Sequence, residues 1–311
     1  MYVIMDMGTT NTRLYLCRDD RPTGSVKGSF GAAFGKKHGR RELLRQMEVL
    51  LKELLDKSTL DGEAVECILA VGMAGSEMGL WEISHIPLPA DARSLAENIR
   101  RVELDGIPIP FLMVPGVKKT DGERLLDMIR GEEVEAVGLA HKLQLTCDAV
   151  FLLPGTHNKI VHVSAGGEIR DLYTTFSGEL LDSLISHTIL KGQAAHDFRL
   201  VPAQVRRGAA YARENGLNAA AYHVRVMAKN GESVDAASSF LYGSVLGEDV
   251  GLIRRASQGK TIYLSGRNVL REAYAILLEE DDVVVLQSEG DFQPMVTGAM
   301  IIKEIYDAEF C

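Results

Sequence analysis

The spacing of apolar residues along the first half of the chain predicts strands and helices in alternation. Residues 40–57 carry leucine and methionine at spacings of three and four among charged residues, which is the pattern of an amphipathic helix. A second helix-like stretch lies near 91–101. Short apolar runs rich in β-forming residues predict strands at 2–5, 12–17, 65–71 and 109–114. This alternation indicates an α/β domain with a partly parallel sheet.

The same plan begins again near the middle of the chain. A strand is expected at 148–153, followed by a turn, a returning strand at 159–163 and a third strand near 168–174. The remaining pattern is mostly helical and ends in a closing helix. The further helices are expected at 178–190, 202–215, 233–256 and 268–279, and the further strands at 261–264 and 282–287.

Two Gly-Thr-x-Asn turns indicate a duplication. The first turn, Gly8–Asn11, and the second turn, Gly155–Asn158, each join two predicted strands. A long internal repeat fixes the architecture of a protein. We therefore expect related domains at 1–147 and 148–311, with a final helix that could pack back on the first domain.

Composition and charge narrow the classes of function. Hydrophobic residues make up 46% and charged residues 25% of the chain, which is typical of a folded globular protein. The net charge of −9 disfavours a nucleic-acid partner, because a surface of that sign repels phosphate backbones. No apolar run is long enough to predict a membrane span. The four cysteines form no CxxC pair, so we expect neither a disulfide framework nor a zinc site, and we expect a cytoplasmic location.

The two turns carry the residue types that bind phosphate groups. Glycine lets the backbone approach an anion, while exposed N–H groups and threonine hydroxyls donate hydrogen bonds to it. Asp6, which leads into the first turn, could hold Mg²⁺ through oxygen. The alternative is that such a turn merely reverses the direction of the chain. In that case His157 is an ordinary turn residue and Lys159 is a solvated lysine. The candidate phosphate ligands are Gly8, Thr9, Thr10, Asn11, Gly155, Thr156, His157 and Lys159.

Several segments together resemble a known family. Residues 6–13, Asp-Met-Gly-Thr-Thr-Asn-Thr-Arg, resemble the first phosphate motif of sugar kinases and actin-like ATPases. In their order along the chain, further segments are similar to those of 2-dehydro-3-deoxygalactonokinases. The resemblance implies two ribonuclease-H-like domains around a cleft, ATP with Mg²⁺ as phosphoryl donor, and a 2-keto-3-deoxy sugar acid as acceptor. These further segments are 72–76 (GMAGS), 128–133 (MIRGEE), 153–159 (LPGTHNK) and 176–180 (FSGEL).

Phosphoryl transfer to a hydroxyl group also needs a carboxylate that accepts the proton. Glu132 and Glu133 begin a predicted helix directly after Gly131, where the helix dipole favours their ionised form. Glutamates in a first helical turn are otherwise ordinary. The resemblance assigns the base to Glu132, with Glu133 as the second choice.

Nucleotide and acceptor contacts are predicted at other turns. A predicted strand is followed by Ser265, Gly266 and Arg267. Glycine is common in turns between a strand and a helix, so its presence alone does not indicate a function. The resemblance favours nucleotide binding at this turn. A sugar acid needs a cation for its carboxylate, and the sequence does not choose between two arginines. Glu179 resembles the glutamate that related kinases aim at sugar hydroxyls, although it could also be a plain helix-start residue. The candidate acceptor ligands are Arg13, Gly75, Ser76, Arg130 and Glu179.

The resemblance, together with these features, implies an ATP-dependent kinase that phosphorylates 2-dehydro-3-deoxygalactonate at O6. The alternatives are a kinase of the same fold acting on another sugar or amino sugar, and a non-catalytic actin-like ATPase module. The expected partner is a small-molecule sugar acid, with no nucleic acid or membrane, and a homodimer is possible on general grounds.

Overall fold

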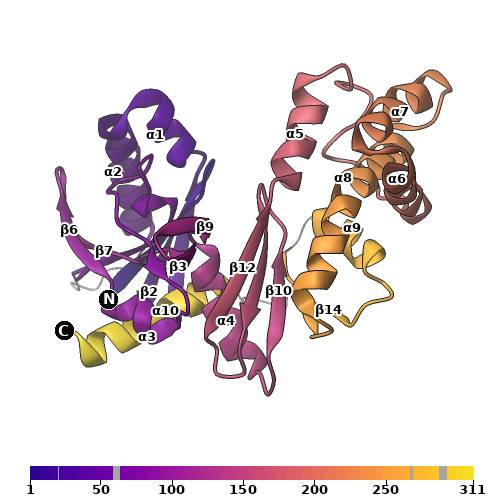
Figure 1. Ribbon diagram of the computed structural model, residues 1–311. Helices are drawn as coiled ribbons and strands as arrows, with labels where there is room; N and C mark the ends of the chain where they lie inside the picture. The colour runs from indigo at the N-terminus through magenta and orange to yellow at the C-terminus, as the bar shows by residue number, and fades with distance from the viewer. Residues whose placement is uncertain (20, 59–63, 267–268, 287–292) are drawn as a thin grey trace. The chain divides into compact units, whose positions relative to one another are not determined.

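The computed structural model describes residues 1–19, 21–58, 64–266, 269–286 and 293–311 (Figure 1). Contacts between residues divide the chain into two units. Unit 1 comprises Met1–Thr146, Ala165–Asp171 and Asp291–Cys311, and unit 2 comprises Cys147–Ser164 and Leu172–Gly290.

Unit 1 is built on a six-stranded mixed sheet with the order β3-β2-β1-β4-β7-β6. Strands β1, β4 and β7 run parallel, while β2 is antiparallel to β1 and β3, and β6 is antiparallel to β7. Every residue of β4 is buried, as expected for a central parallel strand. The strands are β1 Tyr2–Met7, β2 Thr12–Arg18, β3 Arg21–Gly28, β4 Ile68–Gly72, β6 Arg100–Leu104 and β7 Ile107–Met113.

Helices and a small second sheet complete unit 1. The apolar face of α2 contributes Leu43, Met47, Leu50 and Leu54 to the core beside the large sheet. Helix α10 contacts α3 and α4. Its crossing with α4 is close because both helices carry glycine there: a Cβ atom on Gly138 would lie 1.9 Å from the Pro294 carbonyl oxygen. The helices are α1 Ala32–His38, α2 Arg40–Lys57, α3 Ala92–Glu97, α4 Glu132–Leu143 and α10 Pro294–Glu309, and the small sheet has the order β5-β8-β9 with β5 Ile86–Pro87, β8 Val117–Asp121 and β9 Arg124–Ile129.

Unit 2 repeats the plan with a five-stranded mixed sheet in the order β12-β11-β10-β13-β14. Strands β10, β13 and β14 run parallel, and β11 is antiparallel to β10. Long α8 packs against α5, α6, α7 and α9. The strands are β10 Ala149–Leu153, β11 Asn158–Val163, β12 Ile169–Thr175, β13 Ile262–Leu264 and β14 Val283–Val285, and the helices are α5 Ser177–His187, α6 Pro202–Asn215, α7 Leu217–Lys229, α8 Val234–Ser257 and α9 Val269–Leu277.

The two sheets confirm the predicted α/β fold with an internal repeat. In each sheet the third, second and first strands of a unit are neighbours, and the next central strand pairs with the first in parallel. One predicted element was wrong, and some elements were missed. The stretch near 91–101 is not one helix, because α3 ends at Glu97 and β6 begins at Arg100. The helix α7, which follows Gly216, was not predicted.

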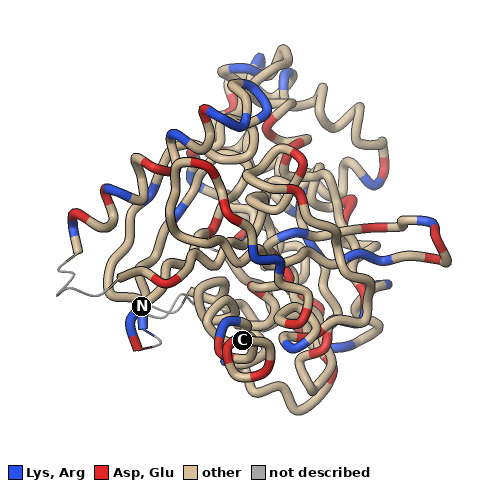
Figure 2. Tube along the Cα trace, turned by 90° about the vertical axis from the view of Figure 1, so that its left-hand side faces the viewer, with Lys and Arg blue, Asp and Glu red and all other residues tan. Residues whose placement is uncertain are grey.

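Acidic and basic residues are interleaved along the chain trace in Figure 2. Helix α2, for example, carries both signs on its exposed side and forms internal ion pairs such as Glu42–Arg45. Among the residues that the structure describes, no helix is long and apolar enough to cross a membrane.

Candidate active site

The first turn connects β1 to β2 and is covered by the start of α1. The Gly8 N–H donates to the Asn11 carbonyl oxygen at 2.8 Å, which closes the turn. The Ala32 and Ala33 N–H groups donate to the carbonyl oxygens of Gly8 and Thr9 at 3.0 and 2.9 Å. Thr9 and Thr10 are exposed, so their hydroxyl groups are accessible to a ligand.

The second turn has the same arrangement in unit 2. The Gly155 N–H donates to Oδ1 of Asn158 at 3.1 Å, and the Glu179 N–H of α5 donates to the Thr156 carbonyl oxygen at 2.7 Å. In both units, the segment that covers the turn contacts it through a glycine. The sequence motifs did not predict this contact. A Cβ atom on Gly31 would lie 2.3 Å from the Gly8 oxygen, and one on Gly178 would lie 2.0 Å from the Gly155 oxygen.

We expect Gly178→Ala to destabilise unit 2 and to weaken nucleotide binding. The new methyl group would meet two backbone oxygens, of Gly155 and Thr156, that cannot move independently of the turn. Overpacking of this kind costs about 1–3 kcal/mol of unfolding free energy. Gly251→Ala, at an exposed position of α8, is the control, because its nearest neighbour would be the Arg255 side chain at 3.4 Å. Urea unfolding and ATP titration measure both effects, and wild-type values for Gly178→Ala would refute the tight contact.

Asp6 lies at the end of β1 beside the loop that follows β4. Its Oδ2 accepts a hydrogen bond from Nη1 of Arg13 at 3.2 Å. Burial raises the pKa of Asp6, and the charge and hydrogen bond of Arg13 partly oppose that rise. A Cβ atom on Gly72 would lie 3.8 Å from Oδ1 of Asp6, and one on Gly131 would lie 3.2 Å from the Gly72 Cα. The ends of β1 and β4 therefore meet the start of α4.

The two glutamates that begin α4 have different surroundings. Glu133 is 1% exposed, and both of its carboxylate oxygens accept hydrogen bonds from the Gly131 N–H at 2.8 Å. Burial, together with the charge of Glu132, raises the pKa of Glu133 to about 7. Glu132 is only half-buried, and its Oε2 accepts from the Arg130 N–H at 3.2 Å. Of the two, Glu132 is the carboxylate that solvent, and so a substrate, can reach.

We expect stability to fall with rising pH through the titration of Glu133. The folded pKa of about 7 lies above its ordinary value of 4.5. Between these pH values the folded state binds more protons than the unfolded state, so the unfolding free energy decreases as pH rises. The loss is at most about 3 kcal/mol, because one pKa unit corresponds to about 1.4 kcal/mol. Glu133→Gln should remove this decline in urea unfolding at pH 5 and pH 7.5, and an unchanged decline would assign it to other groups.

The Gly72–Ser76 loop contacts Arg130. Nη2 of Arg130 donates to the Ile83 carbonyl oxygen at 2.8 Å and lies 3.2 Å from Nδ1 of His85. Burial and the Arg130 charge lower the pKa of His85 to about 4. A Cβ atom on Gly75 would lie 2.7 Å from Nη1 of Arg130, so this guanidinium packs inside the loop. Ser76 Oγ donates to the Met73 carbonyl oxygen at 2.8 Å.

In unit 2, His157 and Glu179 form a pair, with Nε2 and Oε2 2.7 Å apart. The Phe176 ring stacks on His157 at 5.6 Å between centroids. Lys159 is buried rather than solvated, at 6% exposure, and its Nζ lies 3.5 Å from Oγ1 of Thr174.

The predicted nucleotide turn follows β13. The Ser265 N–H donates to the Leu152 carbonyl oxygen at 3.1 Å, and Gly266 has a positive φ of 97° that favours glycine. Arg267 lies outside the described residues. Among the described residues, no group of three or more His, Cys, Asp or Glu side chains could hold a metal ion.

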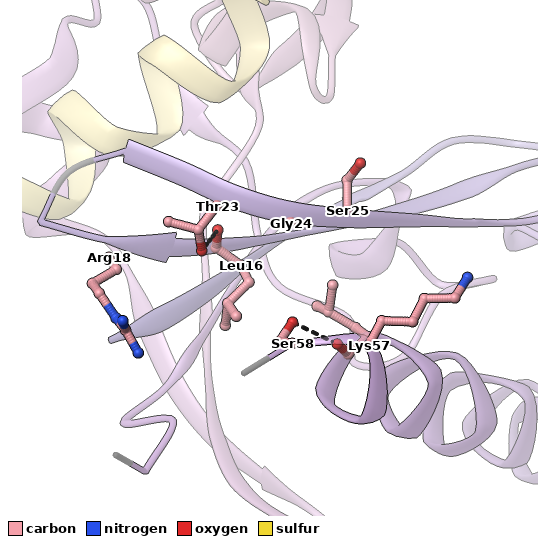
Figure 3. Close-up of a pocket in the computed structure, with 8 residues that line it drawn as sticks. Leu16, Arg18, Thr23, Gly24, Ser25, Lys57 and Ser58 are labelled. Atoms are coloured by element: carbon pink, nitrogen blue, oxygen red, sulfur yellow. Dashed lines mark hydrogen bonds between the residues drawn. The ribbon is translucent and has the colours of Figure 1, made fainter. Parts of the chain in front are cut away.

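A polar hollow in unit 1 lies away from these residues (Figure 3). The hollow lies between the C-terminal end of β2, the start of β3 and the C-terminal end of α2. At this end of α2, Ser58 Oγ donates to the Leu54 carbonyl oxygen at 2.7 Å. Because β2 leaves the first turn at Thr12 and ends at Arg18, the hollow does not belong to the phosphate turns. It is lined by Leu16, Arg18, Thr23, Gly24, Ser25, Leu54, Lys57 and Ser58.

The two sheets arrange their corresponding strands in the same order, and in each unit a helix covers the Gly-Thr turn. These features define a protein of the actin-like ATPase and sugar kinase class. The sequence model of the 2-keto-3-deoxy-galactonokinase family matches residues 6–299. The chain belongs to this family, and it is an ATP-dependent kinase of the actin-like fold with an alcohol group as acceptor. The family also implies a sugar acid as substrate. The resemblance of the sequence motifs is thus confirmed.

Solved structures agree on the fold. A candidate 2-dehydro-3-deoxygalactonokinase from Sinorhizobium meliloti superposes with a TM-score of 0.78 at 22% identity, covering 100% of this chain and 99% of its own. The activator of 2-hydroxyisocaproyl-CoA dehydratase from Clostridium difficile, solved with ADPNP, gives a TM-score of 0.53 at 12% identity, covering 99% and 96%. A search of curated protein sequences found no significant match.

Proposed function

We propose that this kinase transfers the γ-phosphoryl group of ATP to the 6-hydroxyl group of 2-keto-3-deoxy-galactonate. The observation that carries the proposal is the meeting of β1, β4 and α4 in unit 1 at Asp6, Gly72 and Gly131. Ligands of open α/β sheets bind beyond the carboxyl ends of their strands, which is where these residues lie. Asp6 and Glu132, both half-buried carboxylates, therefore lie within one region of unit 1.

Glu132 is the proposed general base. Its carboxylate accepts the proton of the acceptor hydroxyl while the hydroxyl oxygen attacks the γ-phosphorus and the bond to the ADP oxygen breaks. The Arg130 N–H holds this side chain through Oε2, and the helix dipole of α4 favours its ionised form. Glu133 has a different proposed role, which is to fix the bend at Gly131 from inside the protein.

The turns are the proposed phosphate ligands. Thr156 and His157 in unit 2 are exposed, as are Thr9 and Thr10 in unit 1. Hydrogen bonds from α1 and α5 hold the turn carbonyl groups, which leaves hydroxyl groups of the threonines able to donate to phosphate oxygens. We assign the nucleotide to unit 2, where Ser265 and Gly266 follow β13, and the acceptor to unit 1.

Asp6 is the proposed ligand of Mg²⁺. A magnesium ion usually takes one or two carboxylates and completes its shell with water and substrate phosphates, so a single aspartate fits. Such an ion would neutralise charge on the transferred phosphoryl group. Arg13 favours the ionised form of Asp6, which a metal ligand needs, through its charge and its hydrogen bond, and so opposes the effect of burial on the pKa of Asp6.

Arg13 is the better candidate for the carboxylate of the acceptor. Its side chain is 48% exposed, so its guanidinium can donate to a ligand beyond Asp6. The Arg130 guanidinium instead donates to the Ile83 carbonyl oxygen, in the segment between β4 and β5. The Gly75 backbone and Ser76 would then line the acceptor site. Glu179 belongs to unit 2 and pairs with His157, so its role as a ligand of acceptor hydroxyls stays a prediction from the resemblance alone.

Initial rates of ADP release with a panel of acceptors test the proposal. We expect the highest kcat/KM with 2-keto-3-deoxy-galactonate, a lower value with its C4 epimer, and a further loss when the carboxylate is replaced by a neutral group. Faster turnover of another sugar or amino sugar would move the acceptor assignment. Equal ATP hydrolysis with every acceptor and with none would favour a non-catalytic ATPase module.

A further inference from the structure

A buried carboxylate of α8 lies beside the second turn. Asp249 is 7% exposed, and its neighbours on the same face of α8, Leu246 and Ile253, are fully buried. An ionised carboxylate in such surroundings is costly unless hydrogen bonds satisfy it. Four side chains supply them: Oδ2 accepts from Thr175 Oγ1 at 2.8 Å, from Asn158 Nδ2 at 3.2 Å and from the Tyr274 hydroxyl, and Oδ1 accepts from Ser177 Oγ at 2.8 Å.

The donors come from the segments that shape the second turn. Asn158 closes the turn, and Thr175 ends β12. Ser177 is the first residue of α5, the helix whose Glu179 N–H donates to the turn at Thr156. One carboxylate therefore fixes both the turn and the helix that covers it.

The second turn needs this support for a reason that the first turn does not share. The first turn is closed by backbone, because the Gly8 N–H donates to the Asn11 carbonyl. The second turn is closed by a side-chain amide, because the Gly155 N–H donates to Oδ1 of Asn158. An amide has an acceptor oxygen and a donor nitrogen, so a reversed orientation would break this closure.

Asp249 determines that orientation together with Tyr274 and Thr175, whose hydroxyl groups donate to Asp249 and accept from the Asn158 nitrogen at 2.7 and 3.2 Å. A carboxylate can only accept hydrogen bonds, so it must face the Asn158 nitrogen, and the Asn158 oxygen must then face Gly155. We infer that Asp249 is a positioning residue for nucleotide binding, which holds the second turn in its phosphate-binding shape through Asn158. The inference rests on the proposed role of the second turn as a phosphate ligand.

Asp249→Asn tests the inference through nucleotide affinity. The amide keeps one acceptor oxygen but replaces the other with a donor nitrogen and loses the charge, so it cannot accept from all four partners, and we expect the Kd for ADP and the KM for ATP to rise about tenfold or more. The KM for the sugar acid should stay near its wild-type value, whereas a general loss of folding would lower the maximal rate and leave both KM values unchanged. Ser244→Ala is the control, because Ser244 is buried on the same helix and donates only to the Phe240 and Gly208 carbonyls. Wild-type nucleotide affinity in folded Asp249→Asn would overturn the inference.

Two further variants keep the test decisive. If Asp249→Asn does not fold, Asn158→Ala decides, because Asp249 then retains three donors while the closure of the turn at Gly155 and its link to Asp249 are lost together. Weakened ADP binding in Asn158→Ala supports the inference, and unchanged binding overturns it. The double variant Asn158→Asp with Asp249→Asn exchanges acceptor and donor, so ADP binding should recover relative to Asn158→Asp alone, and no recovery would count against the inference. Wild-type protein that binds no ADP would instead refute the proposed function.

Discussion

Glu132→Gln is expected to lower kcat by a factor of at least ~10² while ATP binding is retained. A general base contributes about 10²–10⁴ in rate, and an amide cannot accept the proton of the acceptor hydroxyl. Glutamine has the same shape as glutamate, and its side-chain oxygen can still accept the hydrogen bond that the Arg130 N–H donates to Glu132. Single-turnover rates with saturating ATP measure the chemical step directly.

Glu135→Gln is the matched control for this experiment. It removes one negative charge from the same first turn of α4, where Glu132, Glu133 and Glu135 all lie, without touching the proposed base. Its kcat should stay within a few-fold of the wild-type value. A normal rate in Glu132→Gln would move the base elsewhere, and equal losses in both variants would indicate an effect of helix charge alone.

Asp6→Asn is expected to reduce kcat/KM for ATP on the order of 10³. Metal coordination supplies several kcal/mol of charge stabilisation in the transition state, and each 1.4 kcal/mol is about tenfold in rate. The amide keeps the size of the side chain but loses the charge that faces Arg13. Asp121→Asn, at the exposed end of β8 in the same unit, controls for loss of one negative charge.

The Mg²⁺ dependence of the rate shows whether the loss of activity in Asp6→Asn comes from loss of the metal ligand. If Asp6 holds the ion, Asp6→Asn should need a higher Mg²⁺ concentration for half-maximal activity, and saturating Mg²⁺ should recover part of the rate. A wild-type dependence on Mg²⁺ in this variant would assign the metal to other ligands.

Elements with a strong local pattern were predictable from the sequence. The leucine and methionine spacing of 40–57 predicts a helix, and α2 spans Arg40–Lys57. The two Gly-Thr turns predict a repeated hairpin, and the sheet orders confirm the repeat. The close approach requires glycine in the covering segments, at Gly31 and Gly178, whereas a Cβ atom on Gly8 or Gly155 would meet its nearest neighbour at 3.5 or 3.7 Å.

Features that depend on distant contacts were not predictable. The β8–β9 hairpin has few buried residues, so it lacks the alternation that marks a strand. Asp249 gave no signal, since its partners lie at 158, 175, 177 and 274 in the sequence. The catalytic assignments, a homodimer and a cytoplasmic location stay predictions.

Phosphorus NMR of the reaction with 2-keto-3-deoxy-galactonate tests the central claim most directly. The account predicts one new phosphate monoester, coupled to the protons of carbon 6, for each ADP formed. Inorganic phosphate as the only product beside ADP, or an ester at another carbon, would contradict it.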